Sequence, residues 1–278
     1  MPKGIRIRYR VMAIALVWLM ATLVRAEAAL PDRQWQQLLD AAGVSAVLAQ
    51  ADLLIQQEIA NLEKAPLGFS AQELQNLQQQ LLNRLGPEQL QADMVARLQQ
   101  QLTSQQQQDL QRLLQSPRTR FLHTLQAQLD DAAVREAMRS YRVQVKERAP
   151  NEHRIELIAE LDASLQQSAL ETELKVELRK QLLAMVTQMK TDETFSEALL
   201  DQQLADYRRD LESSISHNAL HAYLYLLKRT PSPQVEALID TYNQPAYEQF
   251  MALCHSTLLA SFRSAREQML QDLRVAKQ

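Results

Sequence analysis

Residues 104–126 read SQQQQDLQRLLQSPRTRFLHTLQ, and residues 232–254 read SPQVEALIDTYNQPAYEQFMALC. The two stretches are 128 positions apart, and this shift places Pro117 on Pro245. In both, apolar residues recur at spacings of three and four, which is typical of a helix that packs on one side. Repetition of one helical element indicates a chain built by internal duplication.

The remaining sequence has the same helical character. Leucine, alanine and glutamine are abundant, and the chain has only 4 glycines, a composition that favours helix over sheet. No stretch alternates between apolar and polar residues as a half-buried strand would. We therefore predict an all-α fold, a tandem duplicated bundle of short and long helices with proline-marked corners. The repeats are expected at 32–149 and 151–276, with the seam at Ala149-Pro150-Asn151.

Several helix ends have recognisable signals. Ser70 with Glu73, and Ser104 with Gln107, have the spacing of a capping box, in which each side chain satisfies a free amide at the helix start. After Pro117 the apolar spacing continues to residue 149, which predicts one long helix there.

The first 28 residues have the three parts of a secretory signal peptide. Four cations precede an apolar run at 11–24, and small residues then offer cleavage after Ala26 or Ala28. The run is shorter than the roughly 20 apolar residues that a membrane-spanning helix needs. We therefore expect cleavage, export to the bacterial periplasm and no stable membrane span in the mature chain.

Charge and cysteine content limit the classes of partner. Removal of residues 1–28 takes away five cations and one carboxylate, so the formal net charge moves from −3 to −7. An acidic chain repels phosphate groups, which argues against nucleic acid or anionic lipid as the main partner. The single cysteine, Cys254, cannot form an internal disulfide, and we expect it to be a buried apolar residue.

The two proline elements also carry a resemblance. Leu113-Leu114-Gln115-Ser116-Pro117 and Thr241-Tyr242-Asn243-Gln244-Pro245 each follow a short helix. This pattern resembles a family of secreted bacterial helical proteins catalogued as domain of unknown function number 2059, here as two tandem units covering most of 32–276. The chain departs from the family pattern at Arg118 and Ala246, where glycine is common, and at Leu114, where an aromatic residue is common. The resemblance implies a secreted helical protein and supplies no catalytic residues.

The corner residues have two readings. Proline in the first turn of a helix loses no hydrogen bond, and the polar residue before it can cap free amides, so a sharp corner forms at low energetic cost. The alternative reading is a shared recognition surface. The residues concerned are Gln115, Ser116, Pro117, Asn243, Gln244 and Pro245.

The only candidate for reaction chemistry is a histidine pair. His217 and His221 are one helical turn apart, a spacing that can hold zinc or copper if a third ligand converges. Asp210 or Glu212 could supply a carboxylate nearby. A plain surface or partly buried pair is the simpler interpretation, and no cofactor is implied.

Three hypotheses for function follow. The first is a non-enzymatic periplasmic protein whose helices present a groove to a protein, peptide or lipid of the envelope. The second is a metal-binding or hydrolytic envelope enzyme that uses His217 and His221. The third is a structural module that bridges other envelope proteins or self-associates through its long helices.

Overall fold

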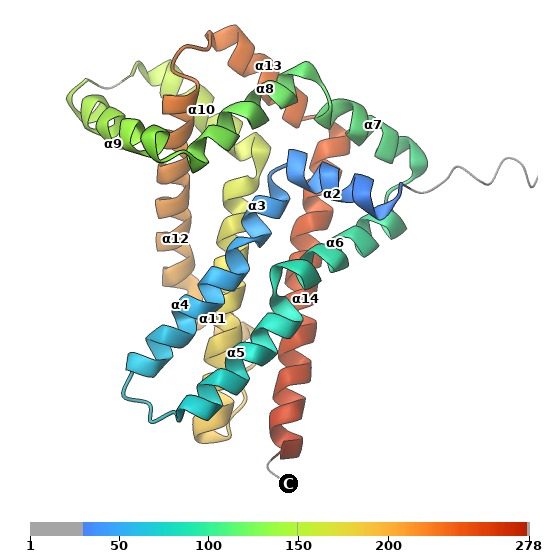
Figure 1. Ribbon diagram of the computed structural model, residues 1–278, viewed down its shortest axis with the longest axis vertical. Helices are drawn as coiled ribbons and strands as arrows, with labels where there is room; N and C mark the ends of the chain where they lie inside the picture. Colours follow the sequence, from blue (N-terminus) through green and yellow to red (C-terminus); the bar gives the residue numbers. More distant parts are fainter. Residues whose placement is uncertain (1–29, 149, 277–278) are drawn as a thin grey trace, which may run out of the picture.

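The computed structural model describes residues 30–148 and 150–276, and in these ranges every regular element is helical. The predicted all-α class is therefore confirmed. The elements, labelled in Figure 1, are α2 (Asp32–Ala41), α3 (Val44–Leu48), α4 (Gln50–Lys64), α5 (Ala71–Leu85), α6 (Pro87–Gln101), α7 (Ser104–Leu114), α8 (Pro117–Gln126), the 3₁₀ helix η1 (Ala127–Asp130), α9 (Ala132–Glu147), α10 (Glu152–Leu165), α11 (Gln167–Thr191), α12 (Glu197–Leu226), α13 (Ser232–Tyr242) and α14 (Pro245–Ala276). The predicted signal peptide lies outside the described residues.

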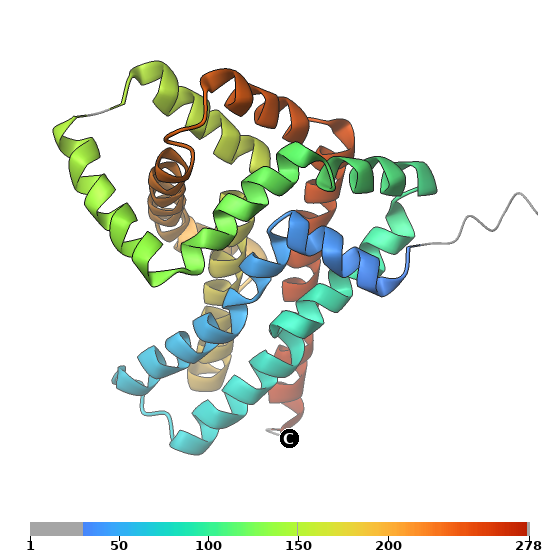
Figure 2. The ribbon, with the colours of Figure 1, turned by 45° about the horizontal axis from the view of Figure 1, so that its top comes forward.

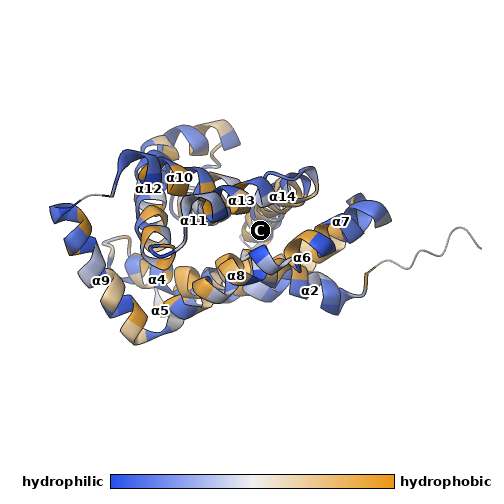
Figure 3. Ribbon diagram, turned by 90° about the horizontal axis from the view of Figure 1, so that it is seen from above, coloured by the Kyte–Doolittle hydropathy of each residue, from blue (hydrophilic) through white to orange (hydrophobic). Residues whose placement is uncertain are grey.

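Helices α11 and α14 form the centre of the bundle. They pack against each other, α12 packs on α11, and α6 and α5 pack on α14. Seen from above (Figure 3), α5, α8, α6 and α2 lie along one side of the molecule, while α10, α11, α13 and α14 lie along the other. One continuous apolar core contains fully buried side chains from both sides, among them Trp35, Leu81, Leu165 and Phe262. The two halves therefore share a single core.

The two proline corners have similar local geometry. Pro117 and Pro245 each begin a helix, and each follows an 11-residue helix, α7 or α13. The packing across the corners is reciprocal, because α7 contacts α14 while α13 contacts α8. Each short helix thus packs against the helix that begins at the proline of the other corner.

Two further pairs of residues, one member before and one after residue 149, have similar local roles. Gly43 follows α2 with φ of 74°, and Gln166 follows α10 with φ of 57°, so each helix ends at a left-handed residue. Ser70 caps the N-terminus of α5 and accepts a hydrogen bond from Glu73 N. Ser196 caps the N-terminus of α12 and accepts a hydrogen bond from Leu199 N. In the first half the helix is interrupted at Ala49, between α3 and α4, and at Gly86, between α5 and α6. In the second half α11 and α12 each continue as a single long helix.

Two predicted details need correction. The single helix expected from Pro117 to residue 149 is interrupted by η1, and a separate helix, α9, starts after it. The reason is a local cap, since the Asp131 carboxylate accepts a 2.7 Å hydrogen bond from Ala133 N. The second capping box is formed by Thr103 and Gln106, one residue earlier than expected, whereas the Ser70–Glu73 box is present as predicted.

Candidate functional site

The two proline corners lie beside each other and enclose a surface hollow of about 700 Å³. Ser116 and Pro117 line it from the α7–α8 corner, and Gln244 and Pro245 line it from the α13–α14 corner. Its other lining residues are Asp109, Arg112, Leu113, Arg118, Thr241 and Ala246. Four of the six corner residues singled out in the sequence are thus brought to one place, although they are far apart in the chain.

Ser116 acts mainly as a helix cap. Its Oγ accepts from Thr119 N at 3.3 Å and lies 3.0 Å from Thr119 Oγ1, which itself donates to the Leu113 carbonyl at 2.8 Å. These contacts fix the turn between α7 and α8. The structural reading of the corner therefore holds for Ser116.

Gln244 fixes the second corner through its backbone. Its carbonyl accepts from Tyr247 N at 2.9 Å and from Glu248 N at 3.1 Å, which leaves its exposed side chain free for the hollow. Gln115 and Asn243, the remaining two candidates, end α7 and α13 and do not line the hollow.

Two buried tyrosines flank the second corner. Tyr242, at the end of α13, packs edge-to-face on Tyr247 with ring centroids 4.9 Å apart, and the Tyr247 hydroxyl donates to the Leu165 carbonyl at 2.9 Å. Burial raises the pKa of Tyr242 to about 12, and a hydrogen bond with Thr119 offsets part of that rise. Both tyrosines are therefore neutral structural groups at physiological pH.

The histidine pair lies elsewhere, on α12. The rings of His217 and His221 are 4.5 Å apart and packed edge-to-face, with His217 exposed and His221 buried. Burial lowers the pKa of His221, and the charges of His217, Arg142 and Lys146 lower it further. Among the described residues no group of three or more His, Cys, Asp or Glu side chains is placed to hold a metal ion.

The two carboxylates considered as partners of the histidines are not equivalent. Glu212 and His217 line one hollow, and the lining of this hollow also includes Asp162 and Glu173. Asp210 does not line it. The described residues thus supply no third ligand that converges with both histidines.

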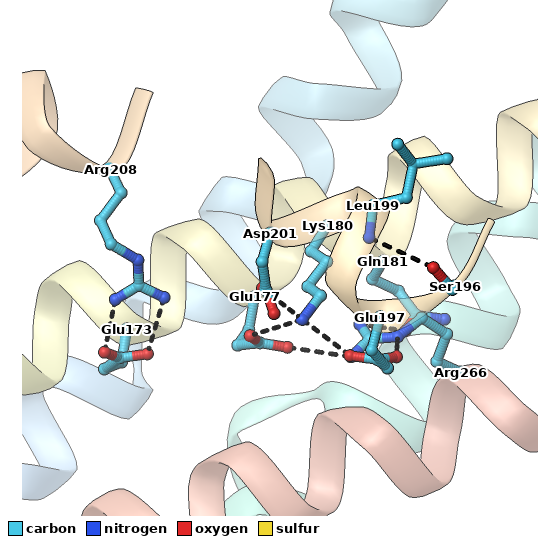
Figure 4. A network of polar contacts seen from close by, with 10 residues as sticks. All are labelled: Glu173, Glu177, Lys180, Gln181, Ser196, Glu197, Leu199, Asp201, Arg208 and Arg266. Atoms are coloured by element: carbon cyan, nitrogen blue, oxygen red, sulfur yellow. Dashed lines mark hydrogen bonds and ion pairs between the residues drawn. The ribbon is translucent and has the colours of Figure 1, made fainter. Parts of the chain in front are cut away.

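A network of charged side chains, buried on α11 and α14 and partly exposed on α12, joins these three helices (Figure 4). Arg266 is 3% exposed and donates to Glu177 at 3.1 Å and to Glu197 at 2.8 Å. Lys180, on α11, contacts Glu197 at 2.7 Å and Asp201 at 2.6 Å. Hydrogen bonds from Arg266 and Lys180 outweigh the effect of burial and hold the pKa of Glu197 below its usual value. The network contacts no hollow described above, so we assign it to the fold.

Sequence reasoning missed this network. A signal exists in α11, where Glu177 and Lys180 stand among leucines on a helix buried on several sides. A helix that is surrounded by others must bury some of its polar positions, and buried charges need partners. The partner Arg266 comes from a distant helix, and no local spacing indicates it.

A second polar cluster connects the two halves. Gln126 Nε2 donates to the Tyr223 hydroxyl at 2.9 Å and to Gln167 Oε1 at 3.0 Å. Gln167 Nε2 in turn donates to the carbonyl of Ala42 at 2.8 Å, beside Gly43. These residues line a cavity of about 420 Å³ between α2, α8, α11 and α12. Burial raises the pKa of Tyr223, which makes it a neutral hydrogen-bonding group.

Cys254 is fully buried in the core on α14. Burial raises the pKa of its thiol far above the usual range, so the thiolate form is not available. Cys254 is the apolar core residue that the sequence predicts.

Comparison of the chain with protein-family models, curated proteins and solved structures gave no match. The resemblance to the helical family therefore stays a hypothesis. Within the described ranges no single helix is long and apolar enough to cross a membrane, although α2 and the α3–α4 segment, bent by 84°, meet the length and composition test as a pair.

Proposed function

We propose that this protein is an exported, non-enzymatic binding module of the bacterial envelope and that a protein or peptide partner binds in the corner hollow. The supporting observation is that Ser116, Pro117, Gln244 and Pro245 line one hollow. Corner residues of a fold can serve packing alone, whereas a surface hollow built from two loops is a common place for recognition.

The chemistry of the hollow favours a peptide over a lipid chain. Its apolar surface comes from Leu113, Ala246 and the two prolines, while hydroxyl, amide, carboxylate and guanidinium groups surround it. Such groups match the carbonyl and amide groups of a peptide backbone. Arg118 is exposed at the rim and adds a charge that would select acidic side chains of the partner.

We further infer that the halves derive from one duplicated unit. The supporting observations are the paired left-handed residues Gly43 and Gln166, the two proline corners and the reciprocal packing of α7 on α14 and α13 on α8. Duplication explains why both corners reach the same hollow, because a two-fold relation brings equivalent loops together.

Site-specific crosslinking tests the binding proposal. A photo-reactive residue is placed at Arg118 or at Gln244, which are exposed on opposite rims, and the protein is produced in bacterial cells. Both positions should give an adduct with the same partner. Gln79, exposed on α5, is the control and should give none. Different adducts at the two rims, or equal labelling at Gln79, would contradict the proposal.

The N-terminus of the exported protein tests the localisation. Cleavage after Ala26 or Ala28 predicts a periplasmic form that begins at Glu27 or Ala29. Intact-mass measurement on the periplasmic fraction identifies the start. Recovery of the uncleaved chain in the cytoplasmic fraction alone would refute export.

The metal-binding alternative finds less support. The cations Arg142 and Lys146 act on His221, and their charges oppose a divalent cation at the histidine pair. Metal analysis of protein purified without an affinity tag tests this alternative directly. A stoichiometric metal ion that is lost in His217→Ala would revive it.

A further inference from the structure

Helix α9 crosses the upper end of α12. In Figure 2, with the top of the molecule brought forward, α8, α9 and α10 curve around the end of α12, and α9 and α10 both contact it. Tyr141 of α9 packs edge-to-face on Tyr225 of α12, with ring centroids 5.6 Å apart. This contact fixes the crossing of the two helices.

Four basic side chains lie on these two crossing helices. Arg142 and Lys146 are one turn apart on α9, and His217 and His221 are one turn apart on α12. The two pairs interact electrostatically, because Arg142, Lys146 and His217 all lower the pKa of His221. No ion pair joins any of the four to a carboxylate within the described residues. Their positive charge is thus not neutralised by a direct ion pair.

Two buried polar atoms in this cluster have no hydrogen-bond partner. His221 is 9% exposed, and its Nδ1 is buried and unpaired, as is Nε of Arg142. A buried polar atom without a partner costs roughly 1–3 kcal/mol, so folded proteins rarely keep one unless it has a role. Both atoms can donate once His221 is protonated, and an acceptor would satisfy them.

The charges around the cluster decide what kind of acceptor fits. From α9 come Arg142 and Lys146, and from α12 comes His217, so the groups that act on His221 are all basic. His217 also lines a hollow that contains Asp162, Glu173 and Glu212. The α9 side of the histidine pair is therefore the basic side. Helix α9 as a whole carries four cations and two carboxylates, in contrast to the acidic chain.

We propose that Arg142, Lys146, His217 and His221 form a binding site for a phosphate group. A guanidinium presents paired donors to phosphate oxygens, an ammonium adds a point charge, and imidazoles supply one donor each when protonated. The phosphate belongs either to a free phosphate compound or to the head group of an anionic phospholipid. The site is separate from the corner hollow, so neither proposal depends on the other.

Calorimetric titration of the purified full chain with inorganic phosphate is the first test. Arg142→Gln and Lys146→Gln should each weaken binding by about three- to tenfold, because each removes a charged donor. Arg135→Gln removes an exposed cation from the same helix and should change the affinity less than twofold. Equal loss in all three variants would indicate general attraction to basic surface and overturn the site.

Vesicles distinguish the two sources of phosphate. The same variants are sedimented with vesicles of phosphatidylglycerol and of phosphatidylcholine, and comparison between variants cancels any contribution of the N-terminal apolar run. Binding to phosphatidylglycerol that needs Arg142 and Lys146, without measurable binding of inorganic phosphate, assigns the site to a lipid head group. Absence of variant-dependent binding to either probe overturns the proposal.

Histidine titration by NMR gives a readout that a purely structural role would not produce. The free protein should show a depressed pKa for His221, and sulfate, whose charge is constant over this range, should raise it. Sulfate affinity should then increase as the pH falls through that pKa. An unchanged His221 pKa at saturating sulfate would overturn the proposal, even if a variant such as His221→Gln failed to fold.

Discussion

Arg266 and Glu177 form a hydrogen-bonded ion pair in the interior of the bundle, with 3.1 Å between Arg266 Nη2 and Glu177 Oε2 and side chains 3% and 5% exposed. The pair connects α14 to α11, the two helices at the centre of the core. Arg266 also reaches Glu197 at the start of α12. One guanidinium thus fixes the relative positions of three long helices.

Arg266→Met should destabilise the protein by about 3–5 kcal/mol, because it leaves Glu177 buried without its partner. Urea unfolding followed by circular dichroism measures the change. Arg263→Met on the same helix is the control, since Arg263 is exposed, and should change stability by less than about 0.5 kcal/mol. Adding Glu177→Gln to Arg266→Met should recover part of the loss, and no recovery would count against the pairing.

Gly43→Ala should destabilise by about 2 kcal/mol or more, from left-handed strain and a disturbed hydrogen bond. Gly43 has φ of 74°, and an added Cβ would lie 2.4 Å from Gln167 Nε2, which donates to Ala42 O. Gly68→Ala is a matched control, because Gly68 has φ of 64° with no atom within 4 Å of an added Cβ. Gly68→Ala should lose stability through backbone strain alone. Equal losses of stability in the two variants would therefore exclude an effect of the close contact with Gln167.

Pro117→Gly and Pro245→Gly should each lower stability by about 1 kcal/mol, because each frees backbone that the corner holds in one conformation. Thermal unfolding measures the loss. Pro66→Gly, in the exposed loop between α4 and α5, is the control and should have a smaller effect. Melting temperatures equal to wild type in both corner variants would contradict the corner interpretation.

Asp162→Asn should stabilise the protein at neutral pH. Burial raises the pKa of Asp162, only partly offset by the 2.7 Å hydrogen bond from Ser168, so the folded state favours the protonated form. A raised carboxyl pKa contributes stability at low pH that is lost as pH rises through the folded value. As the pH rises from the pKa of Asp162 in the unfolded state to its pKa in the folded state, wild type should therefore lose stability. Asp162→Asn should not lose stability over the same interval. Parallel curves for the two proteins would refute this assignment.

The sequence anticipated several local elements correctly. The Ser70–Glu73 capping box, the start of helices at Pro117 and Pro245, and the burial of Cys254 are all present. Each depends on neighbouring residues or on composition, which a single sequence displays. The break after Gln126 escaped detection, because the apolar spacing continues across it and only the cap at Asp131 marks the new helix.

The sequence by itself determined the helical class and the positions of the corners, because apolar spacing, capping pairs and proline act within a few residues along the chain. Tertiary structure alone decided that Pro117 and Pro245 face one hollow, that Arg266 meets Glu177, and that α9 packs on α12. These contacts join residues far apart in the chain. Their formation depends on how whole helices pack into a common core, which no local pattern specifies.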